Sequence, residues 1–186
     1  MIFKDKKQII IAFIIVVFFI ILSVFITFMV KDGTDKNNLS ISINSKNINI
    51  TNELPISDIL GKKIEENDKN IGFATISIKN NNKINASYQI FVTKKESNKK
   101  QIKENYIKLY LCDSEGNEIK GFDSSLIPSY NDLRYLNDKP NSKLLYNGTI
   151  AGEDTEKLLL KVWVSDSYAL SDEIENFTFD IGVREK

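Results

Sequence analysis

Histidine is absent from this 186-residue chain, and cysteine occurs once, at Cys112. Without histidine the chain cannot form a Ser-His-Asp or Cys-His catalytic pair, and it lacks the usual nitrogen ligand of a zinc site. Cys112 ends an apolar alternating segment with no activating base suggested near it, so we interpret it as a small packed side chain. We therefore predict no catalytic residue, no metal site and no cofactor, and a protein that is not an enzyme.

Carboxylates and aromatic side chains are the remaining candidates for chemistry. Acidic residues scattered through predicted loops match no EF-hand spacing, so weak calcium binding stays only an alternative; they are Glu115, Glu118, Asp123, Asp132 and Asp138. Trp163 falls in the middle of a predicted strand, which favours a second, partly covered sheet face. Four tyrosines either line a groove or pack between strands: Tyr106, Tyr110, Tyr130 and Tyr135.

The charge of the whole chain is balanced, with 25 basic and 25 acidic residues, so it offers no electrostatic footprint for nucleic acid. The lysine pairs Lys94-Lys95 and Lys99-Lys100 form a local basic patch. This patch is either an ordinary solvated loop or a surface attracted to an anionic cell wall or lipid headgroups.

Residues 9–30 form an apolar segment that no charged residue interrupts. At 1.5 Å per residue, roughly 22 helical residues span about 33 Å, which matches the hydrocarbon core of a bilayer. The segment is longer than the apolar region of a signal peptide, and no small-x-small cleavage site follows it. Lys4, Lys6 and Lys7 precede it, so the positive-inside rule places the N-terminus in the cytoplasm.

These features predict four regions and a localisation. Residues 1–8 form a cytoplasmic basic tail, 9–30 a single-pass transmembrane signal anchor in the lipid bilayer of the cell membrane, 31–38 a polar linker, and 39–186 an extracytoplasmic domain. About 150 residues suffice for one domain with its own core, without disulfides.

Period-2 alternation of apolar and polar residues predicts short strands through this domain. The clearest is 156–165, where Leu158, Leu160, Val162 and Val164 share one face. Further strands are expected over 39–50 (with a break near Ser45-Lys46), 73–79, 84–93, 106–112, 118–122, 144–150 and 176–184.

Two local expectations concern apolar residues outside the clear strands. A brief helical turn after Ser57 or Asp58 should leave Ile56, Ile59 and Leu60 turned inward. Ile84 should face the core from the start of its strand. Residues 123–142 read as irregular. Strands that alternate in this way, without helices between them, predict an all-β fold: an antiparallel β-sandwich of jelly-roll or Ig-like type, preceded by one transmembrane α-helix.

Several stretches together resemble the TasA/camelysin-like exported proteins of Gram-positive bacteria. They are NELPISD at 52–58, ATISIKN at 74–80 leading into ASY at 86–88, residues 144–153, LLLKVWVSD at 158–166 and FTFDIGV at 177–183. The resemblance implies a jelly-roll-like sandwich, export, and a role at the cell surface or in a biofilm matrix. It also implies self-association, in which a strand of one subunit completes the sheet of the next.

The chain departs from the pattern of this family in one respect, and one activity linked to the family does not transfer to it. No evident signal-peptidase site follows the apolar segment, so a retained anchor would restrain free fibre assembly. Camelysin carries a metalloprotease label, but no H-E-x-x-H motif exists here, so that activity does not transfer. The leading hypothesis is a membrane-anchored surface protein with a structural, adhesive or matrix-assembly role. The alternative is a ligand-binding or accessory domain of an envelope transport, secretion or sensing complex.

Overall fold

A computed structural model describes residues 39–51, 54–66, 68, 72–122 and 126–186, together with Val17 and Phe19. The chain divides into two compact units, Met1–Asn37 and Asn38–Lys186, and the second is described below. Within the described part of the chain, no helix has the length and apolar character needed to cross a membrane. Apart from Val17 and Phe19, the anchor predicted at 9–30 lies outside the described residues and stays a prediction.

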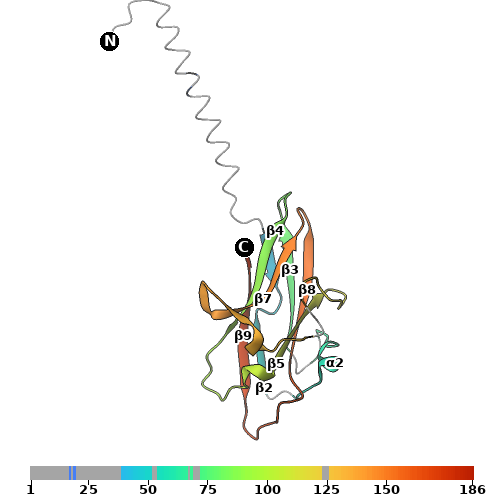
Figure 1. The fold of residues 1–186 in the computed structure, drawn as a ribbon, viewed down its shortest axis with the longest axis vertical. Helices are drawn as coiled ribbons and strands as arrows, with labels where there is room; N and C mark the ends of the chain where they lie inside the picture. The colour runs from blue at the N-terminus through green and yellow to red at the C-terminus, as the bar shows by residue number, and fades with distance from the viewer. Residues whose placement is uncertain are drawn as a thin grey trace, which may run out of the picture. The chain divides into compact units, whose positions relative to one another are not determined.

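Strands dominate the described part of the second unit (Figure 1). Their bounds are β1 Leu39–Ile43, β2 Asn47–Thr51, β3 Gly72–Asn80, β4 Ala86–Lys94, β5 Ile107–Asp113, β6 Arg134–Leu136, β7 Lys139–Ile150, β8 Thr155–Val164 and β9 Asn176–Glu185. Three short helical turns lie between them: α2 Asp58–Gly61, η1 Glu104–Tyr106 and η2 Tyr130–Asp132.

These strands form two antiparallel sheets, which confirms the predicted all-β sandwich (Figure 1). The first, sheet A, has the order β1-β3-β8-β5, and the second, sheet B, has the order β2-β9-β4-β7-β6. Successive strands alternate between the sheets from β1 to β5 and again from β7 to β9. The long strands therefore pair mainly with strands that are distant in sequence. In contrast, β6 pairs with the next strand of the chain, β7.

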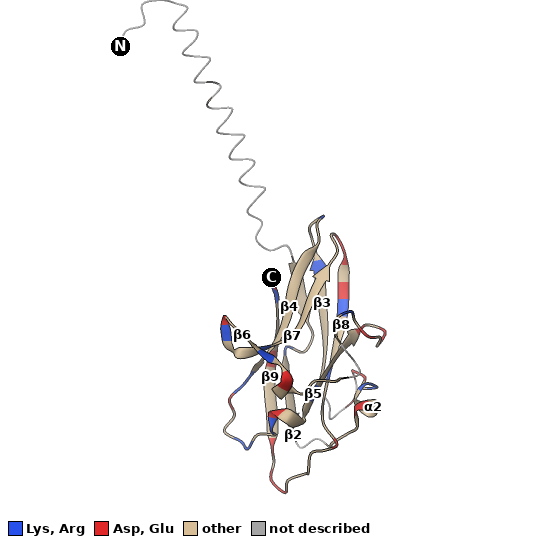
Figure 2. Ribbon diagram, in the orientation of Figure 1, with Lys and Arg blue, Asp and Glu red and all other residues tan. Residues whose placement is uncertain are grey.

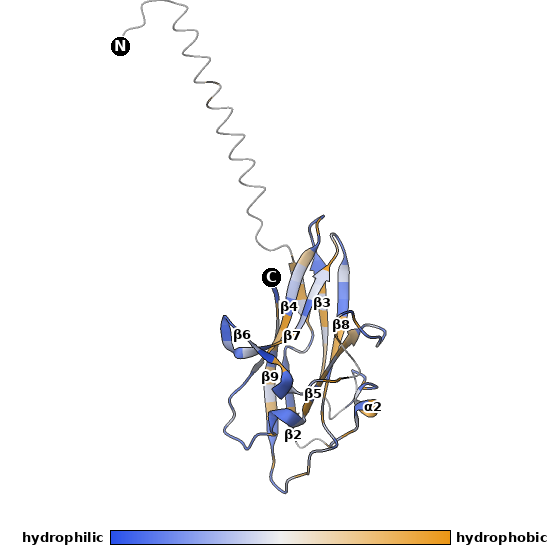
Figure 3. Cartoon of the chain, viewed as in Figure 1, coloured by the Kyte–Doolittle hydropathy of each residue, from blue (hydrophilic) through white to orange (hydrophobic). Residues whose placement is uncertain are grey.

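The core lies between the sheets and is built from the predicted alternating positions. Leu158, Leu160, Val162 and Val164 of β8 are buried, as predicted, because one face of the strand packs on the opposite sheet. Apolar residues follow the strands and polar residues the turns (Figure 3). Sheet B contributes Tyr88, Ile90, Val92, Phe177, Phe179 and Ile181 from its inner face.

Several local predictions were wrong. Ile59 and Leu60 do not turn inward but are 72% and 56% exposed; Gly61 of α2 packs against Trp163 instead, where an added Cβ would lie 2.3 Å from the indole Cε2. Ile84 is 71% exposed because β4 begins two residues later, at Ala86. The predicted strand at 118–122 is reduced to one bridge between Cys112 and Glu118.

The segment predicted to be irregular, 123–142, also differs from expectation. Among its described residues are η2, β6 and the first residues of β7, which starts at Lys139 rather than at residue 144. In contrast, the break predicted near Ser45-Lys46 is confirmed, since β1 ends at Ile43 and β2 begins at Asn47.

Candidate functional site

The break between β1 and β2 is a change of sheet. The Asn44 N–H donates to the Thr75 carbonyl of β3 at 3.1 Å, and the Asn44 Oδ1 accepts from the Thr75 N–H at 2.5 Å. Two residues later the Lys46 carbonyl accepts from the Ile181 N–H of β9 at 2.8 Å. The chain therefore leaves sheet A at Asn44 and joins sheet B at Lys46.

This change of sheet leaves part of β9 without a second neighbour. β2 pairs with β9 only over Asn176–Asp180, whereas β4 pairs with β9 as far as Glu185. Over the described chain, no strand pairs with the outer side of Gly182–Arg184. β1 lies in sheet A, where it is an edge strand paired with β3.

The missing strand exposes residues that belong to the inner faces of the sheets. Ile41 is the register partner of the fully buried Ile78, so both side chains face the interior, yet Ile41 is 39% exposed. Val183 is the partner of fully buried Ile90 and is likewise only half-buried. Each of these interior residues is partly exposed because, among the described residues, sheet B has no strand beside β9 at this level.

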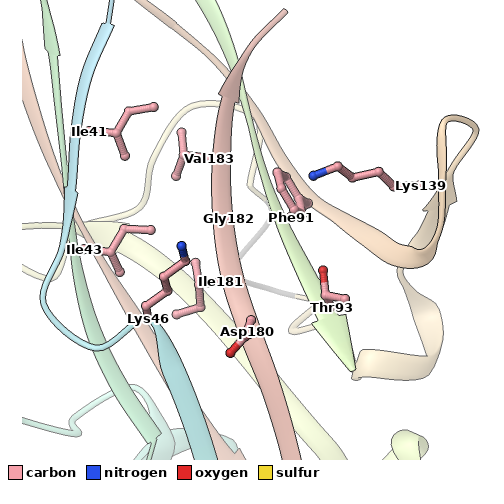
Figure 4. Close-up of a pocket in the computed structure, with 10 residues that line it drawn as sticks. All are labelled: Ile41, Ile43, Lys46, Phe91, Thr93, Lys139, Asp180, Ile181, Gly182 and Val183. Atoms are coloured by element: carbon pink, nitrogen blue, oxygen red, sulfur yellow. The ribbon is translucent and has the colours of Figure 1, made fainter. Parts of the chain in front are cut away.

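The result is a groove of about 400 Å³ between β1 and β9. Ile41 and Ile43 project from β1 toward β9, whose Ile181 and Val183 form the facing wall (Figure 4). Lys46 and Asp180 form its polar end. Although partial burial raises it, the pKa of Asp180 is lowered overall, because Asn47 and Lys95 donate to the carboxylate.

On the outer side of sheet B the groove is bounded by an aromatic ring. Phe91 is the register partner of Gly182, and its ring covers the glycine so closely that an added Cβ would lie 2.3 Å from Phe91 Cζ. The Lys139 Nζ lies 4.3 Å from the centre of the same ring, a cation–π contact. A side chain at position 182 would displace this ring.

A second hollow, of about 570 Å³, lies where β4 ends and β6 meets β7. Lys143 stands at its base, 4% exposed at the side chain, and donates to Glu104 Oε2 at 2.8 Å and to the Tyr130 carbonyl at 3.1 Å. The rings of Tyr130 and Tyr135 lie 4.9 and 4.8 Å from the ammonium. Two of the four candidate tyrosines are thus brought together around one buried lysine.

The other sequence candidates take structural roles. Cys112 is buried, burial raises the pKa of its thiol, and its Sγ lies 3.7 Å from the Leu159 carbonyl. Tyr106 packs on Tyr168, and Tyr110 packs on Phe122. Trp163 is buried beneath α2, consistent with the covered face that was predicted.

The acidic candidates do not converge. Asp132 accepts from the Ser129 N–H and hydroxyl at 2.7 Å and closes η2, while Asp138 pairs with Arg184. In the part of the chain that the structure describes, no three metal-binding side chains gather at one point. Asp123 lies outside the described residues.

The lysine patch is largely neutralised by ion pairs. Lys94 contacts Glu104 at 3.0 Å, Lys95 contacts Asp180 at 3.0 Å, and Lys100 contacts Glu175 at 2.9 Å. Basic and acidic residues are interspersed along the strands and loops in the view of Figure 2. The patch therefore presents less free positive charge than its sequence suggests.

Sequence reasoning did not single out the groove residues, because Ile41, Ile43 and Val183 follow the same alternation as core residues. The one available signal was the interruption of that alternation at Ser45-Lys46, where the chain changes sheet. No protein family, curated protein or solved structure matches the chain.

Proposed function

We propose that this chain is a membrane-anchored, extracytoplasmic β-sandwich protein with a structural, adhesive or matrix-assembly role, and that it associates with other copies by strand addition. The observation that carries the proposal is the groove between β1 and β9. There, interior apolar side chains are partly exposed, and no strand of the described chain pairs with the outer side of Gly182–Arg184.

The backbone of β9 would bind a strand from another copy through hydrogen bonds. Unpaired N–H and C=O groups at a sheet edge are a template for a strand from another chain. A segment of three or four residues beside Gly182–Arg184 would form about two ladder hydrogen bonds, each worth about 0.5–1.5 kcal/mol net. Alternate side chains of that segment would point inward and cover Ile41 and Val183.

The connectivity favours the jelly-roll form of the predicted sandwich. Strand orders β2-β9-β4-β7 and β3-β8-β5, with successive strands in opposite sheets, follow the jelly-roll pattern. An immunoglobulin sandwich instead pairs its first two strands in one sheet. We therefore favour the jelly-roll form of the predicted sandwich, in keeping with the resemblance to TasA/camelysin-like proteins.

The anchor proposed at 9–30 would hold the subunits on one membrane surface, where strand addition builds a two-dimensional assembly rather than a released fibre. Fractionation of the native cells tests this part of the proposal. The protein should stay with membranes after alkaline extraction, and its domain should be digested when protease is added to cells without a wall. Recovery in the cytosol would refute the anchor and the localisation.

A pair of charge substitutions tests strand addition. Ile41→Lys places a charge in the groove wall, whereas Ile84→Lys places the same charge at a 71% exposed position in the β3–β4 turn. We expect the full chain in detergent to associate with rising concentration in sedimentation experiments, and I41K to weaken this association at least about tenfold. A chain that is monomeric at every concentration, or equal effects of I41K and I84K, would contradict the proposal.

A further inference from the structure

The two arginines of the chain line one hollow of sheet B. Among the 25 basic residues of the sequence, only Arg134 and Arg184 are arginines, and the others are lysines. Both line a hollow of about 310 Å³, which shares no lining residue with the groove between β1 and β9. In a chain that otherwise uses lysine, this placement indicates that the planar guanidinium group matters at this hollow.

The strand register places this hollow on the outer face of sheet B. Arg134 of β6 is the register partner of Leu144 of β7, and Leu144 is the partner of Phe91 of β4. Ile90 and Val92, the neighbours of Phe91 along β4, are fully buried in the core. Because successive side chains of a strand point to opposite faces, the row from Phe91 to Arg134 lies on the outer face.

Arg184 already holds a carboxylate at this hollow. Its Nη2 donates to Asp138 Oδ1 at 3.0 Å, and its Nη1 donates to the other oxygen of the same carboxylate. Its Nε donates to Oε1 of Gln89 at 2.9 Å, and Gln89 is itself buried. Arg184 is therefore a fixed wall of the hollow, occupied by a partner from its own chain.

Arg134, in contrast, is available to a ligand. Its side chain is exposed, and no ion pair in the described part of the chain includes it. Asn137, also exposed, lines the same hollow, and its carboxamide carries two donors and an acceptor. Leu144 adds a half-buried apolar surface. The hollow thus combines a guanidinium, a carboxamide and a small apolar floor.

A second cation stands over the same row of residues. The Nζ of Lys139 lies 4.3 Å from the centre of the Phe91 ring (Figure 4), and among the described residues no carboxylate forms an ion pair with it. Adjacent strands are about 4.8 Å apart, so Phe91 is about 10 Å from Arg134 across two strand spacings. Two cations at this separation suit an extended ligand that carries repeated negative groups.

The acidic side chains that line the hollow and the groove do not neutralise these two cations. Each is already paired elsewhere: Asp138 with Arg184, and Asp180 with Lys95. This part of the outer face of sheet B therefore keeps an excess of positive charge, in a chain whose total charge is balanced.

A uronic acid has the groups that this hollow can bind. A guanidinium binds a planar carboxylate through two parallel hydrogen bonds, as Arg184 already does with Asp138. The hydroxyls of a uronate ring can exchange hydrogen bonds with the carboxamide of Asn137, and its C–H groups can contact Leu144. A volume of about 310 Å³ lies at the small end of ligand sites, which suits one sugar ring of a longer chain.

We propose that this face binds a carboxylated polysaccharide, with one uronate held by Arg134 and another carboxylate of the same polymer near Lys139. The proposal adds a ligand to the proposed function. It does not depend on strand addition, because Arg134 does not line the groove between β1 and β9.

Calorimetric titration of the full chain tests the proposal, in a polyoxyethylene detergent that has neither charge nor a sugar headgroup. The probes are hexagalacturonate, hexamannuronate and the neutral cellohexaose. We expect at least one uronate to bind with a Kd on the order of 0.1–1 mM at about 50 mM NaCl, and cellohexaose to bind at least about tenfold more weakly. Raising NaCl to about 500 mM should weaken the uronate at least about fivefold, because exposed charges are screened.

Substitutions at one position separate the guanidinium from charge in general. Arg134→Ala should weaken uronate binding at least about tenfold, and Arg134→Lys, which keeps the charge without the planar fork, at least about threefold. Lys157→Ala removes the same charge from an exposed position of β8 in sheet A and should leave the Kd within about twofold. The urea midpoint of Trp163 fluorescence shows whether each variant is folded.

Four outcomes would overturn the proposal. The first is that neither uronate binds to the folded wild-type chain. The second is that R134A weakens binding no more than K157A does. The third is that R134K binds like the wild type, which would make the contact one of charge alone. The last is that polyphosphate or polyglutamate of equal length binds more tightly than both uronates, which would assign the face to another class of polymer.

Discussion

Replacing Glu104 by glutamine should destabilise the sandwich, because Lys143 would lose its counter-ion. Glu104 accepts from Lys143 at 2.8 Å and from Lys94 at 3.0 Å. Lys143 is 4% exposed at the side chain, whereas Lys94 is 33% exposed and can turn to water. The substitution therefore leaves one buried ammonium without its counter-ion.

The size of the effect follows from what remains around Lys143. Removing one partner of a buried ion pair costs about 3–5 kcal/mol. The Tyr130 carbonyl at 3.1 Å and the two tyrosine rings stay in place, and cation–π contacts are worth about 0.5–2 kcal/mol. We therefore expect Glu104→Gln to lower the free energy of unfolding by about 2–3 kcal/mol, or Tm by roughly 5–10 °C.

Lys143→Met is the matched control. Methionine has a similar length and no charge, and Glu104 then keeps Lys94 and partial access to water. Exchanging a buried ion for an apolar side chain of similar volume is often nearly neutral, so we expect a loss below about 1.5 kcal/mol. Adding this substitution to Glu104→Gln should recover part of the lost stability, since no buried charge is then left unpaired.

Urea unfolding monitored by tryptophan fluorescence measures these differences. Trp163 is the only tryptophan of the chain and is buried in sheet A, so its emission reports on the sandwich alone. The reasoning fails if Glu104→Gln stays within about 0.5 kcal/mol of the wild type, or if Lys143→Met is the more damaging variant.

Three further outcomes follow. Burial raises the pKa of Glu104, but hydrogen bonds from Lys143 and Lys94 outweigh it and lower that pKa below 4.5. The stabilisation by Glu104 should therefore be complete above pH 4.5 and disappear as the pH falls through the lowered pKa, and urea midpoints across this range should fall less in E104Q. Gly148→Ala should lower the free energy of unfolding by about 1–3 kcal/mol in the same assay, because its Cβ would lie 2.1 Å from Tyr88 Cζ. Cys112 should react with a thiol reagent at pH 8 only after unfolding, because it is buried and its pKa is raised.

The alternation of apolar and polar residues predicted most of the strands correctly. Successive side chains of a strand point to opposite faces, so a strand with one buried face must alternate in this way. One face of β8 must meet the opposite sheet, so Leu158, Leu160 and Val162 could be placed in the core without coordinates. The method failed at Ile59 and Ile84, which lie in turns. There an apolar side chain has no alternation to follow, and its direction depends on partners that are distant in sequence.

The candidate sites were harder to predict for a different reason. A lysine is normally placed on the surface, yet Lys143 is buried because its counter-ion, Glu104, lies 39 residues earlier in sequence and is brought to it by the fold. Ile41 reads as a core residue, and it is exposed because no strand in the described part of sheet B lies beside β9 at its level. A distant partner such as Glu104 leaves no mark on the local sequence around Lys143, and the strand missing beside β9 left only the interruption of the alternation at Ser45-Lys46.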